Sequence, residues 1–167
     1  MLKYTICFIK RKNNLLLLNR DKKPNMGLWN GVGGKIENGE SPYHSVIRET
    51  YEETGIHLKE ATFAGTATWK SDNGDAGMYI FMADLSENPM ISTPLSTDEG
   101  VLDWKDIEWV LNQDNKGVVS NIKLYLPKIL EGNYKLEHRF NYEKGIMQSY
   151  DSTGLSQFDF ECVYRVK

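Results

Sequence analysis

Apolar runs alternate with short polar turns along the first half of the chain. Segments 3–9 (KYTICFI) and 15–19 (LLLLN) flank the polar turn RKNN, which predicts two strands joined by a tight turn. The run Leu15–Leu18 lacks alternation, which indicates a strand buried on both faces. Segments 61–70 and 77–85 predict two further strands around the turn SDNGDAG.

A helix is predicted between Ser41 and Gly55, because both ends have capping signals. Ser41 suits the N-cap, Pro42 the first turn and Gly55 the position just past the end. The 3.6-residue period then divides the side chains into two faces. We expect Arg48, Glu49, Glu52 and Glu53 on the polar face and Val46, Ile47 and Thr50 toward the core.

The second half of the chain predicts a strand running into a helix at 102–111, and a longer helix near 118–131 that Gly132 ends. Pro127 inside that helix should kink it or restart a turn. Segments 133–142 and 145–151 are plausible strands.

The tail alternates strictly, which predicts a last strand. Its apolar face would hold Phe158, Phe160, Cys162, Tyr164 and Val166. We therefore expect one α+β domain over residues 1–167, with a C-terminal strand extension over about 133–167. Its apolar stripe could cover a sheet edge, narrow a pocket or pair two subunits as a homodimer.

Composition narrows the class of protein. A chain of 167 residues with 40% hydrophobic and 26% charged residues can bury the core of a single domain. A net charge of −3 argues against a stable nucleic-acid partner. Cys7 and Cys162 suggest no disulfide framework, and no segment is long enough to span a bilayer. We expect a cytoplasmic protein with no membrane partner.

Three glutamates crowd the C-terminal half of the predicted helix. Glu49 and Glu53 are four residues apart on one face, close to the negative end of the helix dipole, at a cost of about 1 kcal/mol. A divalent cation would offset this cost. The preceding segment GVGGK can bend closely around a ligand, and Lys35 suits a phosphate group. Mg²⁺ prefers such a site, with a few carboxylates and substrate phosphate oxygens.

The pattern that contains these residues resembles the Nudix box of the Nudix hydrolases, here residues 34–56. Its fixed positions are Gly34, Glu40, Arg48, Glu49, Glu52, Glu53, Gly55 and the aliphatic Ile56. Thr50 departs from the pattern, because an aliphatic residue is usual there. The resemblance implies an α/β/α sandwich with a mixed central sheet, and an enzyme that hydrolyses a nucleoside diphosphate linked to another group.

The resemblance also implies a role for each residue of the box. Glu49 and Glu53 would be the main Mg²⁺ ligands, joined by Glu52 and the Gly33 carbonyl; Mn²⁺ is a candidate replacement. Either Glu52 or Glu53 would be the general base. Arg48 would orient a carboxylate, and Glu40 would do the same or bind a second ion.

Over residues 2–130 the chain further resembles the MutT-like and mammalian-type 8-oxo-dGTP diphosphatases. This implies that Asn30 hydrogen-bonds a purine, that Thr5 and Arg20 lie in the pocket, and that Glu99 is a further carboxylate near the metal. The mammalian-type enzymes read the oxidised base with a pair of adjacent aspartates, for which Asp114 and Asn115 are the nearest candidates here. Each residue also has an ordinary alternative: a turn for Asn30, a solvated loop for Glu99 and plain strand structure for Thr5.

We expect mainly structural roles for the remaining tryptophan and histidine side chains. Trp29, Trp104 and Trp109 suit the core or a pocket wall, and any of them could stack on a base. The three histidines are scattered, and we expect no metal ligation from His44, His57 or His138.

Three functions fit the sequence. The leading one is Mg²⁺-dependent hydrolysis of a nucleoside triphosphate to monophosphate and pyrophosphate, with 8-oxo-dGTP as a candidate substrate. The second keeps the chemistry but acts on ADP-ribose, dinucleoside polyphosphates or capped RNA; the acidic balance counts against RNA. The third is a regulator that binds a nucleotide without hydrolysing it, although such a protein would be expected to lose box carboxylates.

Overall fold

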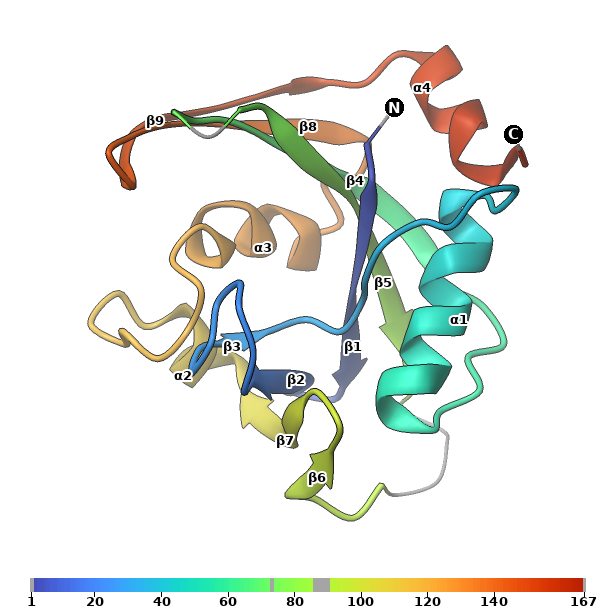
Figure 1. Ribbon diagram of the computed structural model, residues 1–167, viewed down its shortest axis with the longest axis vertical. Helices are drawn as coiled ribbons and strands as arrows, with labels where there is room; N and C mark the ends of the chain where they lie inside the picture. The colour runs from blue at the N-terminus through green and yellow to red at the C-terminus, as the bar shows by residue number, and fades with distance from the viewer. Residues whose placement is uncertain (1, 73, 86–90, 167) are drawn as a thin grey trace.

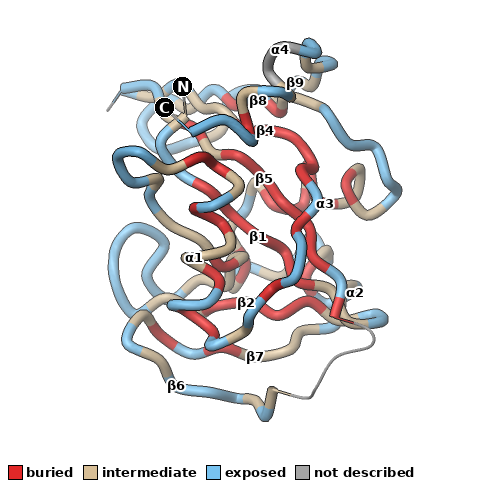
Figure 2. The backbone as a smooth tube through the Cα atoms, turned by 90° about the vertical axis from the view of Figure 1, so that its right-hand side faces the viewer, coloured by how far each residue is buried: buried red, intermediate tan, exposed pale blue. Residues whose placement is uncertain are grey.

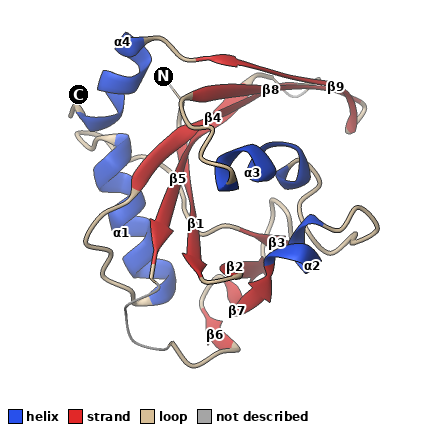
Figure 3. Ribbon diagram, turned by 180° about the vertical axis from the view of Figure 1, so that it is seen from behind, coloured by secondary structure: helices blue, strands red, loops and turns tan. Residues whose placement is uncertain are grey.

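A computed structural model describes residues 2–72, 74–85 and 91–166, without the side chains of Phe158 and Asp159. Its described strands form one mixed sheet, with helices on both faces (Figures 1 and 3). The strand order is β6-β7-β2-β1-β5-β4-β8-β9, and β3 pairs with β2. The pairs β1–β5 and β4–β8 are parallel, whereas the other neighbours are antiparallel. The predicted α/β/α sandwich with a mixed central sheet is confirmed.

The strands and helices have the following bounds along the chain. The strands are β1 (Tyr4–Arg11), β2 (Asn14–Arg20), β3 (Trp29–Asn30), β4 (Thr62–Lys70), β5 (Ala76–Asp84), β6 (Leu95–Thr97), β7 (Gly100–Asp106), β8 (Leu136–Glu143) and β9 (Ile146–Gly154). The helices are α1 (Pro42–Thr54), α2 (Ile107–Leu111), α3 (Ile122–Leu130), α4 (Gln157–Glu161) and the 3₁₀ helix η1 (Cys162–Tyr164).

The core has two layers, one on each face of the sheet. Leu15 and Leu17 belong to the cluster under α3, whereas Leu16 and Leu18 belong to the cluster under α1. All four are at most 1% exposed, so the predicted burial of this strand on both faces is confirmed. The buried positions follow the central strands through the molecule (Figure 2).

Helix α1 has the predicted ends. The Ser41 side chain accepts a hydrogen bond from the His44 amide, and Gly55 caps the C-terminus in the left-handed conformation. Thr50 and Val46 are buried beneath it, as expected. The predicted hairpin β4–β5 and the strand-to-helix passage β7–α2 are also present.

The helix predicted near 118–131 begins four residues later than expected, at Ile122. The reason is a competing set of backbone hydrogen bonds. The Trp29 amide donates to the Gly117 carbonyl at 2.8 Å, and the Val119 amide donates to the Trp29 carbonyl at 3.1 Å. Residues 117–119 therefore pair with β3 instead of starting the helix.

The predicted last strand is wrong, because residues 157–164 are helical. Phe160, Val163 and Tyr164 are spaced for one helical face, and that face packs on the core next to α1. The Phe160 ring lies 5.6 Å from Phe63, and the Tyr164 ring lies 5.3 Å from Tyr43. Strands β8 and β9 confirm the earlier part of the extension.

Candidate active site

The glycine-rich segment lies beside β1, and this places Gly33 against helix α1. The Thr5 amide donates to the Gly34 carbonyl at 2.9 Å, and the Cys7 amide donates to the Val32 carbonyl at 2.7 Å. Because successive residues of an extended segment alternate in direction, the Gly33 amide is left to face the helix. It donates to Glu53 Oε2 at 2.8 Å.

Two glycines are required for this close approach. Gly33 has a φ of +146°, and a Cβ there would lie 2.3 Å from the Thr5 carbonyl oxygen. A Cβ on Gly34 would lie 2.4 Å from the carboxyl carbon of Glu49. The Glu49 carboxylate thus lies in the space that Gly34 leaves free, which explains a fixed glycine at the start of the motif.

Arg48 gathers three of the carboxylates. Its Nε and Nη2 donate to both oxygens of Glu40, at 3.0 and 2.9 Å. Its Nη1 donates to Glu49 and to Glu52, each at 2.9 Å. Partial burial alone would raise the pKa of Glu40, but the hydrogen bonds from Arg48 hold it below its usual value. Arg48 thus contacts Glu40, Glu49 and Glu52, and its expected role of orienting a carboxylate remains a prediction.

Glu53 is buried, which corrects the expectation that it lies on an exposed polar face. Its side chain points under the Gly33 amide, and only 9% of the residue is exposed. Burial raises the pKa of Glu53 to about 7, against the lowering effect of the Gly33 hydrogen bond. Burial also raises the pKa of Glu49. Partly buried carboxylates that repel each other fit a divalent cation, which would favour their charged forms.

The oxygen donors suit Mg²⁺ without forming a closed cage. Within residues 2–72, 74–85 and 91–166, no group of three or more Asp, Glu, His or Cys side chains is arranged to hold a metal ion by itself. Mg²⁺ commonly uses one or two carboxylates together with water and substrate phosphates, so a cage is not needed. Metal ligation by Glu49, Glu52, Glu53 and the Gly33 carbonyl remains a prediction.

A second charged cluster lies at the end of β2, beside the turn between β6 and β7. Arg20 Nη2 and Lys22 Nζ each lie 3.1 Å from a different oxygen of Glu99. The charge of Arg20 lowers the pKa of Glu53, and the charge of Glu99 raises it. The cluster therefore borders the carboxylates of α1. The two predicted residues Arg20 and Glu99 are thus brought together.

The predicted substrate residues occupy different settings. Asn30 pairs with Leu18 across β3 and β2 and therefore shares the face of the sheet that α1 covers. Its Oδ1 accepts a hydrogen bond from the next amide, Gly31, at 2.9 Å. The Thr5 hydroxyl is buried and has no hydrogen-bond partner among the described residues. Lys35 is exposed, and its carbonyl accepts from Arg48.

The loop after α2 uses Asn115 for its own structure. Asn115 Nδ2 donates to the Trp109 carbonyl at 2.8 Å, and its Oδ1 accepts from the Gly117 amide at 2.9 Å. Asp114 is exposed beside it. Sequence reasoning missed Asn121, whose buried Oδ1 has no described partner. Its place just before an apolar helical run is an N-cap signal that could have drawn attention to it.

The aromatic and histidine side chains have structural contacts. The Lys105 ammonium lies 4.3 Å from the Trp29 ring centre and 5.6 Å from that of Trp109. Arg11 lies over Trp104 at 4.1 Å. Further contacts link His44 to Ser41, His57 to Tyr51 and His138 to Tyr150.

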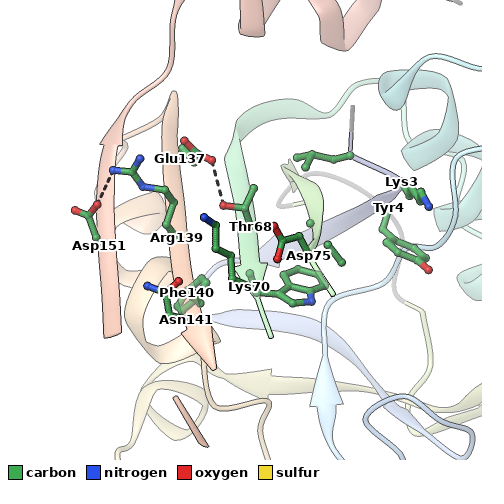
Figure 4. Close-up of a pocket in the computed structure, with 14 residues that line it drawn as sticks. Lys3, Tyr4, Thr68, Lys70, Asp75, Glu137, Arg139, Phe140, Asn141 and Asp151 are labelled. Atoms are coloured by element: carbon green, nitrogen blue, oxygen red, sulfur yellow. Dashed lines mark hydrogen bonds and ion pairs between the residues drawn. The ribbon is translucent and has the colours of Figure 1, made fainter. Parts of the chain in front are cut away.

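A cleft of about 760 Å³ lies elsewhere, over β4, β5 and β8 near the N-terminal residues (Figure 4). Its walls contain two closed polar pairs, Arg139 with Asp151 and Glu137 with Thr68. In the described part of the chain, none of the predicted site residues lines this cleft.

Comparison with known proteins decides the family. The profile of the NUDIX domain matches residues 2–126, which is most of the chain. The chain belongs to the Nudix family. It is a Nudix hydrolase by family. Gly34, Arg48 and Glu53 all lie in its Nudix box, and their contacts hold the residues of the box together.

Relatives agree with this assignment. The Nudix hydrolase YvcI of Bacillus subtilis is 36% identical over 113 residues, which cover 65% of this chain and 68% of that protein. An 8-oxo-dGTP diphosphatase of Proteus vulgaris is 37% identical over 81 residues, covering 48% of this chain and 72% of that protein. The crystal structure of a MutT protein from Bacillus halodurans matches with a TM-score of 0.74 and 28% identity, covering 91% of this chain and 97% of that one.

The described helices of this Nudix protein include none that is long and apolar enough to cross a membrane.

Proposed function

We propose that this protein hydrolyses nucleoside triphosphates to a nucleoside monophosphate and pyrophosphate in the presence of Mg²⁺, with oxidised purine nucleotides such as 8-oxo-dGTP as substrates. The observation that supports it most is the carboxylate of Glu49 lying against Gly34, with Glu53 bonded to the Gly33 amide. The likeness to a bacterial 8-oxo-dGTP diphosphatase supports the substrate class. The role we propose is cleansing of the cytoplasmic nucleotide pool, which protects DNA.

Glu49, Glu52, Glu53 and the Gly33 carbonyl would hold the metal. Bound Mg²⁺ supplies positive charge for the phosphates and lowers the pKa of water. Arg48 keeps Glu40, Glu49 and Glu52 in fixed orientations through its hydrogen bonds. Glu52 and Glu53 are the two candidate bases.

The nucleoside would be recognised on the α1 face of the sheet near β3. The Gly31 amide donates to Oδ1 of Asn30, and we assign its Nδ2 group to a base edge. The unpartnered Thr5 hydroxyl offers a further donor or acceptor, and Arg20 and Lys35 offer positive charge. Asp114 remains a candidate for reading the base, whereas Asn115 would first have to leave its contacts with Trp109 and Gly117.

The first test replaces Glu53 with Gln, which retains an oxygen acceptor for the Gly33 amide. We expect kcat/KM for hydrolysis in Mg²⁺ to fall about 10³-fold, because a ligand charge and a candidate base are lost together. The matched control is Glu60→Gln, an exposed glutamate just past the helix, which should leave the rate unchanged.

Circular dichroism and denaturant unfolding would establish that both variants are folded. Near-wild-type hydrolysis by a folded Glu53→Gln variant would contradict the proposed role of α1.

A further inference from the structure

Lys123, in the first turn of α3, is a buried lysine whose partners are backbone carbonyls. The residue is 9% exposed. Its Nζ donates to the Asn115 carbonyl, and to the Gln113 carbonyl at 3.4 Å. Both carbonyls belong to the loop between α2 and α3, and no ion pair among the described residues includes Lys123. Because a buried lysine needs partners for its ammonium group, this contact fastens the loop to α3.

Asn115 uses all of its polar groups within the same region. Its carbonyl accepts from Lys123, and its amide donates to the Asn112 carbonyl at 3.1 Å. Its side chain donates to the Trp109 carbonyl and accepts from the Gly117 amide. The loop is thus one hydrogen-bonded unit, with Asn115 at its centre and Lys123 as a contact with α3.

The loop continues into hydrogen bonds with the backbone of β3. The Trp29 amide donates to the Gly117 carbonyl at 2.8 Å, and the Val119 amide donates to the Trp29 carbonyl at 3.1 Å. Figure 1 shows α2 and this loop next to β3. Asn30 is the next residue of β3, and Asp114 lies within the loop. A shift of the loop would therefore move both of these candidate residues for nucleoside recognition.

We propose that Lys123 is a positioning residue for nucleoside binding. It fixes the loop 112–117, and through this loop β3, so that Asp114 and Asn30 have their bound geometry before the nucleotide arrives. The inference rests on the proposed function, because it takes the nucleoside to bind beside β3. It gives Asn115 a supporting role in this geometry.

A loop that is held in advance should improve affinity without changing the chemical step. A segment that is already ordered loses less conformational entropy when a ligand binds to it. The hydrogen bonds of Lys123 in the described structure go to the loop, and none goes to a residue of the Nudix box. A loss of binding that affects the substrate and the transition state equally raises KM and leaves kcat unchanged. Removal of the ammonium group should therefore act on KM.

The test compares Lys123→Met with Lys116→Met in the whole chain. Methionine keeps a long unbranched side chain and removes the charge, a change that buried sites often tolerate. Lys116 is a matched control, because it is exposed and its Nζ donates to the same Gln113 carbonyl at 3.3 Å. Three properties are measured: hydrogen exchange of the Trp29 and Gly117 amides, affinity for 8-oxo-dGMP by calorimetry, and kcat and KM for 8-oxo-dGTP in Mg²⁺.

For Lys123→Met we expect about tenfold faster exchange of the two amides, about tenfold weaker binding of 8-oxo-dGMP and a similar rise in KM. The value of kcat should stay within about twofold of the wild type. Lys116→Met should match the wild type in all three properties. Urea unfolding establishes that each variant is folded. If Lys123→Met does not fold, Asn115→Ala replaces it, because it removes the side-chain bonds of the same loop and should give the same changes.

Unchanged amide exchange in Lys123→Met would overturn the positioning role, and so would faster exchange with unchanged affinity for 8-oxo-dGMP. A fall in kcat at constant KM would also contradict it. Exchange and binding require no turnover, so they separate this inference from the proposed function. A protein that shows the expected exchange and binding but hydrolyses no nucleotide would contradict only the proposed function.

Discussion

Thr50 occupies a position of the Nudix box where an aliphatic residue is usual. It is fully buried beneath α1, and the neighbour of its hydroxyl is the weakly polar Cys7 thiol. A buried hydroxyl without a strong partner costs free energy that an apolar methyl of similar shape does not. The departure at this position therefore concerns the packing of α1 against Cys7 of β1.

Replacing Thr50 with Val should raise the free energy of unfolding by about 1 kcal/mol, since it removes the hydroxyl and keeps the volume. Urea denaturation followed by circular dichroism measures the difference. Hydrolysis should be unchanged. A destabilised variant would indicate that the hydroxyl has a bond that matters, and would contradict this interpretation.

Glu53 shows how far a single residue can depart from its sequence pattern. Periodicity groups it with Arg48 and Glu52, yet Glu53 is buried with its carboxylate on the Gly33 amide, whereas Glu52 is exposed. Its burial depends on Gly33, twenty positions earlier, whose amide faces the helix. A helical period describes faces, but it does not tell which neighbour covers a face.

Among the elements, the C-terminal helices α4 and η1 join helix α1 to the rest of the core. Val163 is completely buried, whereas Val166, three residues later, is 57% exposed. Val163→Ala should lower the free energy of unfolding by about 2 kcal/mol, because it opens a cavity in the packing next to α1. The matched change Val166→Ala should have little effect. Equal effects of the two substitutions in thermal or urea unfolding would contradict the helical packing.

The hairpin β8–β9 packs against α3 through His138, and this contact should respond to pH. His138 Nδ1 lies 3.0 Å from the Tyr150 hydroxyl, which donates to the Leu124 carbonyl. Burial lowers the pKa of His138 from 6.5 to about 4, with a further lowering effect of Lys128. Between these two values the unfolded chain binds more protons than the folded protein, so the free energy of unfolding should decrease as pH falls from about 6.5 to about 4.

Urea unfolding at pH 7.5, 6 and 5 measures this dependence. In His138→Gln the group that titrates is absent, so the loss of stability over the same range should be smaller than in the wild type. Identical pH profiles for the two proteins would contradict the burial of a neutral imidazole at this position.

Elements with local signals could be predicted from the sequence, and elements that depend on distant partners could not. Ser41 and Gly55 cap α1 through groups only a few residues away, so its ends were predictable. The apolar residues of the tail fit the period of a strand and also that of a helix. The helix forms because it allows contacts with Phe63 and Tyr43. Residues 117–119 do not begin the helix, because they form backbone hydrogen bonds with Trp29, nearly ninety positions earlier.

The same distinction holds for the candidate site. The carboxylates of the Nudix box could be identified from their spacing, because they lie on one helix. Their expected roles came from the family resemblance. No local pattern indicates that Arg20 and Lys22 both contact Glu99, since 79 and 77 positions separate them from it. Such contacts follow from the alignment of β2 with β7 in the sheet.

In the whole molecule, the sheet separates two kinds of surface. The α1 face presents the glycine segment, the box carboxylates and the cluster around Glu99, whereas α3 and the β8–β9 hairpin close the other face (Figure 1). The fold thus brings acidic groups and the cations Arg20 and Lys22 together at one border of the sheet. This arrangement supports the proposed hydrolysis that releases pyrophosphate.

The measurement that tests this account most directly is a substrate panel in Mg²⁺. It comprises 8-oxo-dGTP, the four ordinary dNTPs, ADP-ribose and a diadenosine polyphosphate, with kcat/KM compared across the set and products separated by chromatography. The account predicts the highest kcat/KM for 8-oxo-dGTP, with monophosphate and pyrophosphate as products. Preference for ADP-ribose or the dinucleotide, or release of single phosphate from dNTPs, would contradict it.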